Sequence, residues 1–472
     1  MQPTLPSEII DIIVDHVGSE SHTKSSRDGL RALALVSVAL LTRAYYYLYD
    51  ELHLVLSSSN AEKDRSSLTV CEKKLASLHE ILAGGLPFPG IALVHHIRSV
   101  RISFVFEKKR DMIAISQLPQ LSGILNALHG PDHGIKTLNV EILDFPMTPI
   151  AFRRTYPIHL FEGSNNILCS ALDSLCHSQR LTTVHLTNVG LRLRELCGTN
   201  VEELHLEQCM FTDQDKNDPD AELDENDDNV LRLKSMTLAD VRHSLSPTTK
   251  SSNLLAKIAH AFHPSSAPAN SLTDPLIPLV FSNLTSLTLQ DDDYTTPLTA
   301  FPALCTLRII QNIFWMRRTM GFMTKLRYFF LPAPGTVRSL GSTQHLIVET
   351  DVNFREIFFD DGEDARLWDA WDIVDAHLTG NNVSSTSTGQ IEPTSTGLQS
   401  VHFLFRFRIQ PGRYLSYQEE PLFIERNRKN LLDRFPLLVS GNYMKFTMDV
   451  LVDRENRIEP SVRCKGPVTG WW

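Results

Sequence analysis

The amino-acid sequence predicts a mixed α/β protein. A short helical unit at the N-terminus is followed by a solenoid built on a curved parallel sheet and by a strand-rich C-terminal cap. Two observations lead to this fold class: amphipathic helical patterns before residue 50, and a six-residue apolar pattern that recurs eight times after residue 96. With 472 residues, of which 42% are hydrophobic and 21% charged, the chain can hold two or three structural units.

The first helix is expected in the stretch "LPSEIIDIIVDHV", from Leu5 to Val17. On a helical wheel Glu8, Asp11 and Asp15 fall within about 60° of one another. The isoleucines and valines cover roughly 200°, about twice the width that a surface helix needs. We therefore expect the acidic strip to face water, and a second surface, in this chain or in a partner, to cover part of the apolar face.

The rest of this unit is predicted from residues 18–56. The polar stretch from Gly18 to Gly29 indicates a loop. In the apolar segment that follows, Ser37 is expected to cap a new helix and so to divide the segment into two helices. Residues 51–56 (ELHLVL) alternate as a strand does. The sequence thus predicts a three-helix unit over residues 1–56.

The six-residue pattern Leu-x-x-Leu-x-Leu, with other apolar residues allowed, defines the second part of the chain. It begins at residues 97, 135, 181, 201, 233, 284, 304 and 326, and several intervals are 20 to 22 residues long. This spacing is typical of leucine-rich repeats, in which each repeat adds one strand to a parallel sheet. The sequence predicts an irregular solenoid over residues 57–340, with helical insertions at 165–177 and 253–262. The alternative is a mixed α/β domain with unrelated strands.

Two polar segments interrupt the chain. Residues 212–229 are strongly acidic and favour a solvated insertion rather than a calcium loop, because the glycine and the twelfth-position glutamate of such a loop are missing. Residues 377–397 are rich in Ser, Thr and Gly and indicate a low-complexity loop within the capping region, 341–472. Alternating strands at 398–409 and 442–453 are expected to pair and to cover the open edge of the solenoid.

Composition limits the partners and the compartment. A net charge of -10 and a pI near 6.0 give no footprint for nucleic acid. No apolar run is long enough to cross a membrane. The seven cysteines form no Cys-x-x-Cys pair, and no secretory signal leads the chain, so reduced thiols in the cytoplasm or nucleus are expected.

The sequence gives little sign of catalysis. Phosphate loops, zinc helices and nucleophile elbows are missing from the sequence, and we expect no cofactor, no metal and no catalytic residue. The carboxylates between Asp360 and Asp372 are the best candidates for acid–base chemistry. They have no partner at a defined spacing, which favours a solvated helix face.

The N-terminal pattern resembles the F-box in its divergent fungal form. The residues that carry the resemblance follow the order Leu-Pro-x-Glu-Ile, a Leu-x-Leu-Val-Ser stretch and an aromatic-rich third helix, with two departures: a longer first loop and no tryptophan in the third helix. The resemblance implies docking on the Skp-type adaptor of a cullin-based (SCF) ubiquitin ligase. The residues that it implies for this contact are Leu5, Pro6, Ile9 and Ile13, supported by Leu35, Val36 and Leu41.

The resemblance thus implies a substrate-recognition subunit without chemistry of its own, whose repeats bind a target protein. The alternative from the same residues is a non-degradative leucine-rich-repeat scaffold, in which the first helices cap the solenoid and bind no adaptor. An enzyme is the third possibility, and it requires a pocket where His, Cys or carboxylate groups converge.

Overall fold

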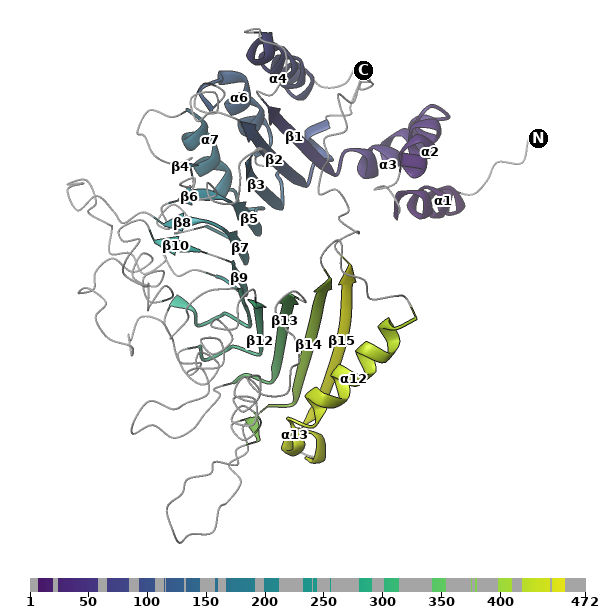
Figure 1. Cartoon of the computed structure of the whole chain (residues 1–472). Helices are drawn as coiled ribbons and strands as arrows, with labels where there is room; N and C mark the ends of the chain where they lie inside the picture. The colour runs from purple at the N-terminus through teal and green to yellow at the C-terminus, as the bar shows by residue number, and fades with distance from the viewer. Residues whose placement is uncertain are drawn as a thin grey trace, which may run out of the picture. The chain divides into compact units, whose positions relative to one another are not determined.

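The computed structural model describes residues 7–19, 24–57, 66–84, 93–106, 114, 116–130, 133–144, 158–159, 167–191, 199–211, 232–239, 241–243, 255, 280–290, 301–313, 342–353, 375, 378–379, 398–409, 418–441 and 444–454. These residues form eight α-helices and a large parallel sheet of eleven strands, which confirms a mixed α/β protein (Figure 1). The chain divides into two compact units: Met1–Leu233 with Ala239–Thr249, and Lys234–Leu238 with Lys250–Trp472.

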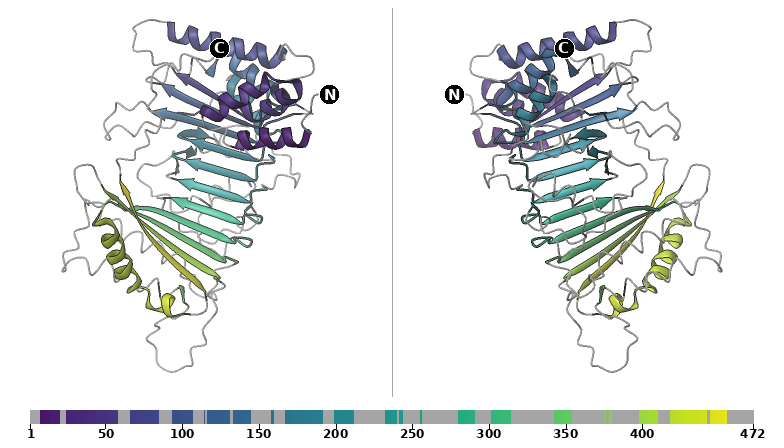
Figure 2. Two further views of the ribbon diagram at one scale, coloured as in Figure 1. Left: turned by 90° about the vertical axis from the view of Figure 1, so that its right-hand side faces the viewer. Right: turned by 90° about the vertical axis from the view of Figure 1, so that its left-hand side faces the viewer.

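The strands of each unit lie side by side (Figure 2). The first unit holds β1 (Glu51–Ser57), β2 (Ser99–Phe106), β3 (Thr137–Asp144), β5 (Thr183–Thr187) and β7 (Glu203–Glu207), which pair in parallel in this order. The second unit holds most of β9 (Ser235–Ala239), then β11 (Ser286–Gln290), β12 (Thr306–Ile313), β13 (His345–Asn353), β14 (Ser400–Ile409) and β15 (Lys445–Arg454). From β11 to β15 each strand pairs in parallel with the next.

The six-residue pattern explains where the strands form. Seven of its eight copies lead into strands of this sheet, and the three apolar residues of each copy are at most 6% exposed. The copy at 326 lies outside the described residues. The second residue of each copy links neighbouring strands: the carbonyl of Arg98, for example, accepts hydrogen bonds from the backbone N–H groups of Lys136 and Thr137. The prediction of one parallel strand per copy is confirmed for these seven.

The C-terminal strands β14 and β15 pair as expected, in parallel, and are the last two strands of the large sheet. The solenoid was predicted to end at residue 340, but the six-residue pattern returns at Thr343-x-x-Leu346-x-Val348 and Leu398-x-x-Val401-x-Phe403. The first of these copies begins with a threonine that is buried among apolar residues, so an apolar template misses it.

Helices pack beside the strands of each unit. In the first unit α4 (Ser66–Gly84) packs on α6 (Pro119–Ala127), and α6 packs on α7 (Ile167–Cys176) (Figure 1). The predicted inward face of α7 is confirmed for Leu168, Ala171, Leu172 and Leu175, whereas Ile167 is 47% exposed. Of the insertion predicted at 253–262, the structure describes only Leu255, which is buried.

In the second unit α12 (Glu420–Leu432) packs on β15, and α13 (Pro436–Ser440) follows it. Phenylalanines join these helices to the buried face of the sheet, with ring centroids 5.2 Å apart for Phe407 and Phe423 and 4.8 Å apart for Phe403 and Phe435. The carboxylate of Asp375 accepts hydrogen bonds from the first backbone N–H groups of α13, at 2.8 Å from each nitrogen. Asp375 therefore caps a helix about sixty residues away.

A second, small parallel sheet lies in the first unit and consists of β4 (Ile158–His159), β6 (Val189–Leu191), β8 (Met210–Phe211) and β10 (Arg242–His243). Asn188 (φ 59°) turns the chain from β5 into β6, and Gln208 (φ 52°) precedes β8. Next to Gln208, the buried Cys209 thiol donates a hydrogen bond to the Leu186 carbonyl of the neighbouring strand at 3.2 Å. Bends of one or two residues thus connect strands of the large sheet with strands of the small sheet in successive copies.

Candidate protein-docking surface

The three helices at the N-terminus form a small bundle with its own core. They are α1 (Ser7–Ser19), α2 (Lys24–Ala34) and α3 (Val38–Leu48). Val14 of α1, Leu30 of α2, and Leu40 and Ala44 of α3 are buried together. A core of this size buries one stripe of each helix and leaves the other faces of α1 open to solvent or to a partner.

Local sequence signals explain one helix boundary and miss another. Ser37 is the N-cap of α3, and its hydroxyl accepts a hydrogen bond from the Leu40 N–H at 3.2 Å, as predicted. The loop predicted from Gly18 to Gly29 is wrong over most of its length, because α1 continues to Ser19 and α2 begins at Lys24. The polar residues at the start of α2 belong to an amphipathic helix that is anchored by the fully buried Leu30.

The residues implied by the F-box resemblance fall into three groups. Leu5 and Pro6 lie outside the described residues. Ile9 and Ile13 are 42% and 43% exposed, and Leu35 and Val36, in the turn between α2 and α3, are 88% and 71% exposed. Leu41 is buried and is not available for a contact with another protein. Four apolar residues of the predicted set are therefore available for contact on the three-helix bundle.

Sequence reasoning did not single out Ile12, which is 62% exposed and more accessible than its two neighbours on α1. It stands three residues after Ile9, and one before Ile13, so the three side chains share one face of the helix. The position of Ile12 on the helical wheel, next to Ile9 and Ile13, could have identified it from the sequence. This isoleucine face of α1, formed by Ile9, Ile12 and Ile13, is a large apolar exposure for a short helix.

The acidic strip of α1 was expected to face water, but one of its members, Asp15, also contacts α3. The two carboxylate oxygens of Asp15 accept hydrogen bonds from Arg43 of α3, both at 2.7 Å, and the Tyr47 hydroxyl donates another at 3.0 Å. The bonds from Arg43 hold the pKa of Asp15 below its usual value. Asp15 therefore fixes α1 on α3, and this contact turns the isoleucine face away from the bundle.

The bundle is attached directly to the sheet of the first unit. The Asp50 carbonyl, two residues after α3, accepts hydrogen bonds at 2.9 Å from the backbone N–H groups of Arg98 and Ser99. The Arg98 guanidinium lies 4.3 Å from the centre of the Tyr46 ring, a cation–π contact. Docking on the bundle would therefore fix the position of β1 and β2 as well.

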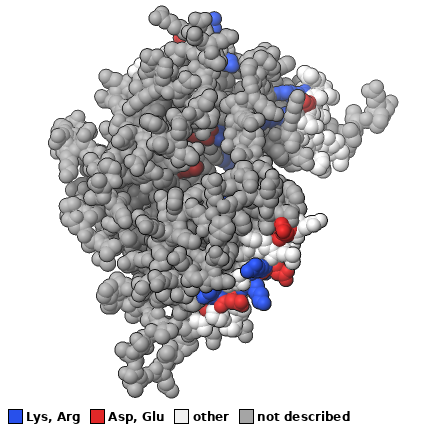
Figure 3. Space-filling model, viewed as in Figure 1, with Lys and Arg blue, Asp and Glu red and all other residues white. Residues whose placement is uncertain are grey.

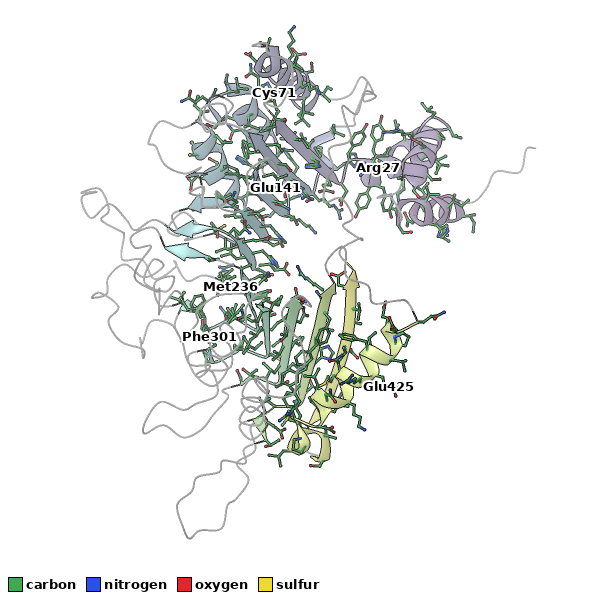
Figure 4. The ribbon with its side chains drawn as sticks, viewed as in Figure 1. Arg27, Cys71, Glu141, Met236, Phe301 and Glu425 are labelled. Atoms are coloured by element: carbon green, nitrogen blue, oxygen red, sulfur yellow. The ribbon has the colours of Figure 1, made fainter. Side chains whose placement is uncertain are left out.

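The face of the sheet opposite its buried apolar residues is polar, and we call it the open face. In the first unit the Arg101 guanidinium donates two hydrogen bonds to Glu141, at 3.0 and 2.8 Å, and the Ser103 hydroxyl donates a third. Figure 4 labels Glu141 on β3. Burial alone would raise the pKa of Glu141, but the bonds from Arg101 and Ser103 outweigh it and the pKa is lowered. The side chain of His53 lies 2.8 Å from Ser103 Oγ and completes the network.

Histidines continue this row of the open face. His185 of β5 and His205 of β7 are paired in register, and their rings are stacked with centroids 4.0 Å apart. Burial lowers the pKa of both imidazoles, so both are neutral near pH 7. Two planar, neutral groups of this kind suit contact with a protein surface.

The remaining candidates from the sequence concern metal binding, acid–base chemistry and the membrane. The described residues contain no cluster of three or more His, Cys, Asp or Glu side chains that could hold a metal ion. The rings of His95 and His133 pack edge to face, with centroids 5.1 Å apart. The carboxylates of Asp360–Asp372 lie outside the described residues, as do the acidic insertion and nearly all of the low-complexity loop. Within the described ranges, every helix is too short or too polar to cross a membrane.

Comparison with known proteins adds no relative. The chain matches no protein-family model, and no curated protein matches it at a significant level.

Proposed function

We propose that this protein is a non-catalytic adaptor: the three-helix bundle docks on the Skp-type subunit of an SCF-type cullin ubiquitin ligase, and the open face of the sheet binds a target protein. The observation that carries the proposal is the isoleucine face of α1, together with Leu35 and Val36. Apolar side chains with this exposure, on a bundle that is otherwise internally satisfied, are typical of a contact with another protein.

The repeat character of the sheet supports the receptor part of the proposal. Cys209 stands at the Asn/Cys position of the leucine-rich-repeat consensus, three residues after the last leucine of its copy. Its hydrogen bond to the Leu186 carbonyl links two successive copies. A stack of such copies exposes a broad polar face that selects partners without any catalytic group.

The adaptor contact can be tested with the full chain and purified Skp-type adaptor in a binding assay. Wild-type protein should bind, and Ile9→Asp combined with Ile13→Asp should weaken binding at least a hundredfold, because each aspartate would be desolvated in an apolar interface. Ile167→Asp is the matched control: Ile167 is an isoleucine of similar exposure on α7, far along the chain. This control should bind as wild type does.

The alternative function, a scaffold whose first helices only cap the solenoid, predicts a different outcome. Wild-type protein would then fail to bind the adaptor at any concentration tested. A thermal melt of the Ile9→Asp, Ile13→Asp variant guards against misfolding, since both side chains lie outside the buried cluster of Val14 and Leu30. Its midpoint should stay within a few degrees of wild type.

A further inference from the structure

Three arginines gather on the open face of the second unit: Arg308 on β12, and Arg406 and Arg408 on β14. Each alternates with buried residues of the core face, such as Leu307 and Phe407. Their side chains are 41%, 38% and 38% exposed. We call these three residues the arginine patch.

Two buried carboxylates of β13, which lies between β12 and β14, hold the arginine patch in place. Glu349 binds Arg308 through Nη2 at 2.6 Å and Arg406 through Nη2 at 3.4 Å, one on each carboxylate oxygen. Asp351 binds Arg408 through Nη2 at 2.5 Å. Because the carboxylates are only 7% and 8% exposed, the positive groups and not the negative ones meet the solvent.

Some polar atoms of this network have no hydrogen-bond partner among the described residues. The Nε–H groups of Arg308 and Arg408 and the Oδ1 atom of Asp351 are buried without a hydrogen-bond partner. Burial raises the pKa of Asp351 in spite of the neighbouring Arg408 and Arg406. Polar groups left in this state are costly, and because these atoms are buried a ligand on the open face would meet the exposed guanidinium groups and not these atoms.

The charge of the patch indicates what it would bind. Glu349 alone pairs with two guanidinium groups, which leaves one positive charge in excess that a single carboxylate neutralises. Arg408 is paired with Asp351 and also has Asp453 in register with it on β15. A phosphate group carries about -1.5 to -2 near neutral pH and would leave the site negative. Planar guanidinium groups match the two oxygens of a carboxylate.

We propose that the arginine patch binds a glutamate or aspartate side chain on an extended segment of the target protein. This step rests on the proposed receptor role of the open face. Arg406 and Arg408 alternate along one strand, so carboxylates at every second residue of an extended segment have the matching spacing.

The test uses the full chain and fluorescein-labelled eight-residue peptides of alternating Glu and Thr, read by anisotropy. The matched peptides replace Glu by Gln or by phosphoserine. Wild-type protein should bind the Glu peptide at least tenfold more tightly than the Gln peptide, and more tightly than the phosphoserine peptide. Tighter binding of the phosphoserine peptide would overturn the assignment to a carboxylate.

Substitutions identify which residues bind the Glu peptide. Arg308→Gln, Arg406→Gln and Arg408→Gln together should weaken the Glu peptide at least tenfold. The control Arg426→Gln, Arg428→Gln and Lys429→Gln removes the same charge from α12, where basic and acidic side chains are interspersed (Figure 3), and should change affinity less than twofold. The reverse result would place binding on α12 and refute the proposal.

A second set of variants covers the case in which the triple glutamine variant fails to fold. Replacing the same three arginines by lysine keeps the charge over Glu349 and Asp351 but removes the second planar N–H. Binding of the Glu peptide should weaken at least threefold, and unchanged binding would contradict the proposal. Because adaptor binding is measured separately, failure here with intact adaptor binding leaves the proposed function standing.

Discussion

The open faces of the two units use the same ion pair at the same positions but complete it differently. Arg101 and Arg308 are each the fifth residue of a six-residue copy, and Glu141 and Glu349 each directly follow the copy on the next strand. In the first unit the carboxylate of Glu141 also accepts a hydrogen bond from a serine hydroxyl, whereas in the second unit the carboxylate of Glu349 also pairs with another arginine, Arg406. Ser103, on the same strand as Arg101, leaves the first pair neutral, whereas Arg406, on a third strand, adds positive charge to the second pair.

The largest expected effect tests whether the two units unfold independently of each other. Leu138→Ala and Leu307→Ala truncate equivalent, fully buried leucines of β3 and β12 and should each cost about 2–5 kcal/mol of unfolding free energy. All five tryptophans lie in the second unit. Denaturant unfolding followed by tryptophan fluorescence should therefore shift with Leu307→Ala and much less with Leu138→Ala. Equal shifts would mean that the units unfold together.

A smaller effect is expected where the ion pairs differ. Glu349→Gln removes the partner of two guanidinium groups and should cost about 2–3 kcal/mol, whereas Glu141→Gln removes the partner of one and should cost about 1–2 kcal/mol. Urea unfolding of both variants measures the difference. If Glu141→Gln proves the more costly, the second arginine adds nothing to the network.

The smallest effect concerns pH and the histidines of the first unit. Burial lowers the pKa of His53, His185 and His205, so their folded pKa values lie below the unfolded value of about 6.5. The folded state binds fewer protons, and stability is therefore full above pH 6.5 and lost as the pH falls through the folded pKa values. The thermal midpoint followed by far-UV circular dichroism should fall by a few degrees between pH 7.5 and 5.5.

A double variant sharpens this prediction. Glu203 is a charged neighbour of both stacked histidines, His185 and His205, and lies on β7 with His205. Replacing both histidines by glutamine should reduce the fall in midpoint and leave the midpoint at pH 7.5 nearly unchanged. A fall as large as in wild type would assign the pH dependence to other groups, His53 first among them.

Much of the fold could be predicted because its signals are local. The cap at Ser37 needs only one side chain and the N–H three residues on, and the strands need only apolar residues at the first, fourth and sixth places of a copy. The copy at Thr343 was missed because burial there depends on neighbours distant in sequence. The start of α2 was missed because a single leucine, Leu30, anchors an otherwise polar helix.

The candidate docking surface was predicted only in part. The width of the apolar face of α1 indicated more isoleucines than one small core can bury, and the F-box resemblance implied contacts by Leu35 and Val36. Ile9, Ile13, Leu35 and Val36 are each exposed. The sequence could not tell that Leu41 faces inward or that Ile12 faces outward, because both lie in apolar runs whose rotation is set by packing. In α1 the burial of Val14 sets that rotation, and the pairing of Asp15 with Arg43 accompanies it.

By itself, then, the sequence determined the three N-terminal helices and α7, the parallel strands of the seven described copies and the apolar surplus at the N-terminus. These follow from periodicity, which each residue expresses with its near neighbours. Only the tertiary structure decided which polar side chains meet on the open face. Arg308, Glu349 and Arg406 come from three strands and from places 41 and 57 residues apart in the sequence, and they are brought together by the register of parallel pairing, which no local pattern encodes.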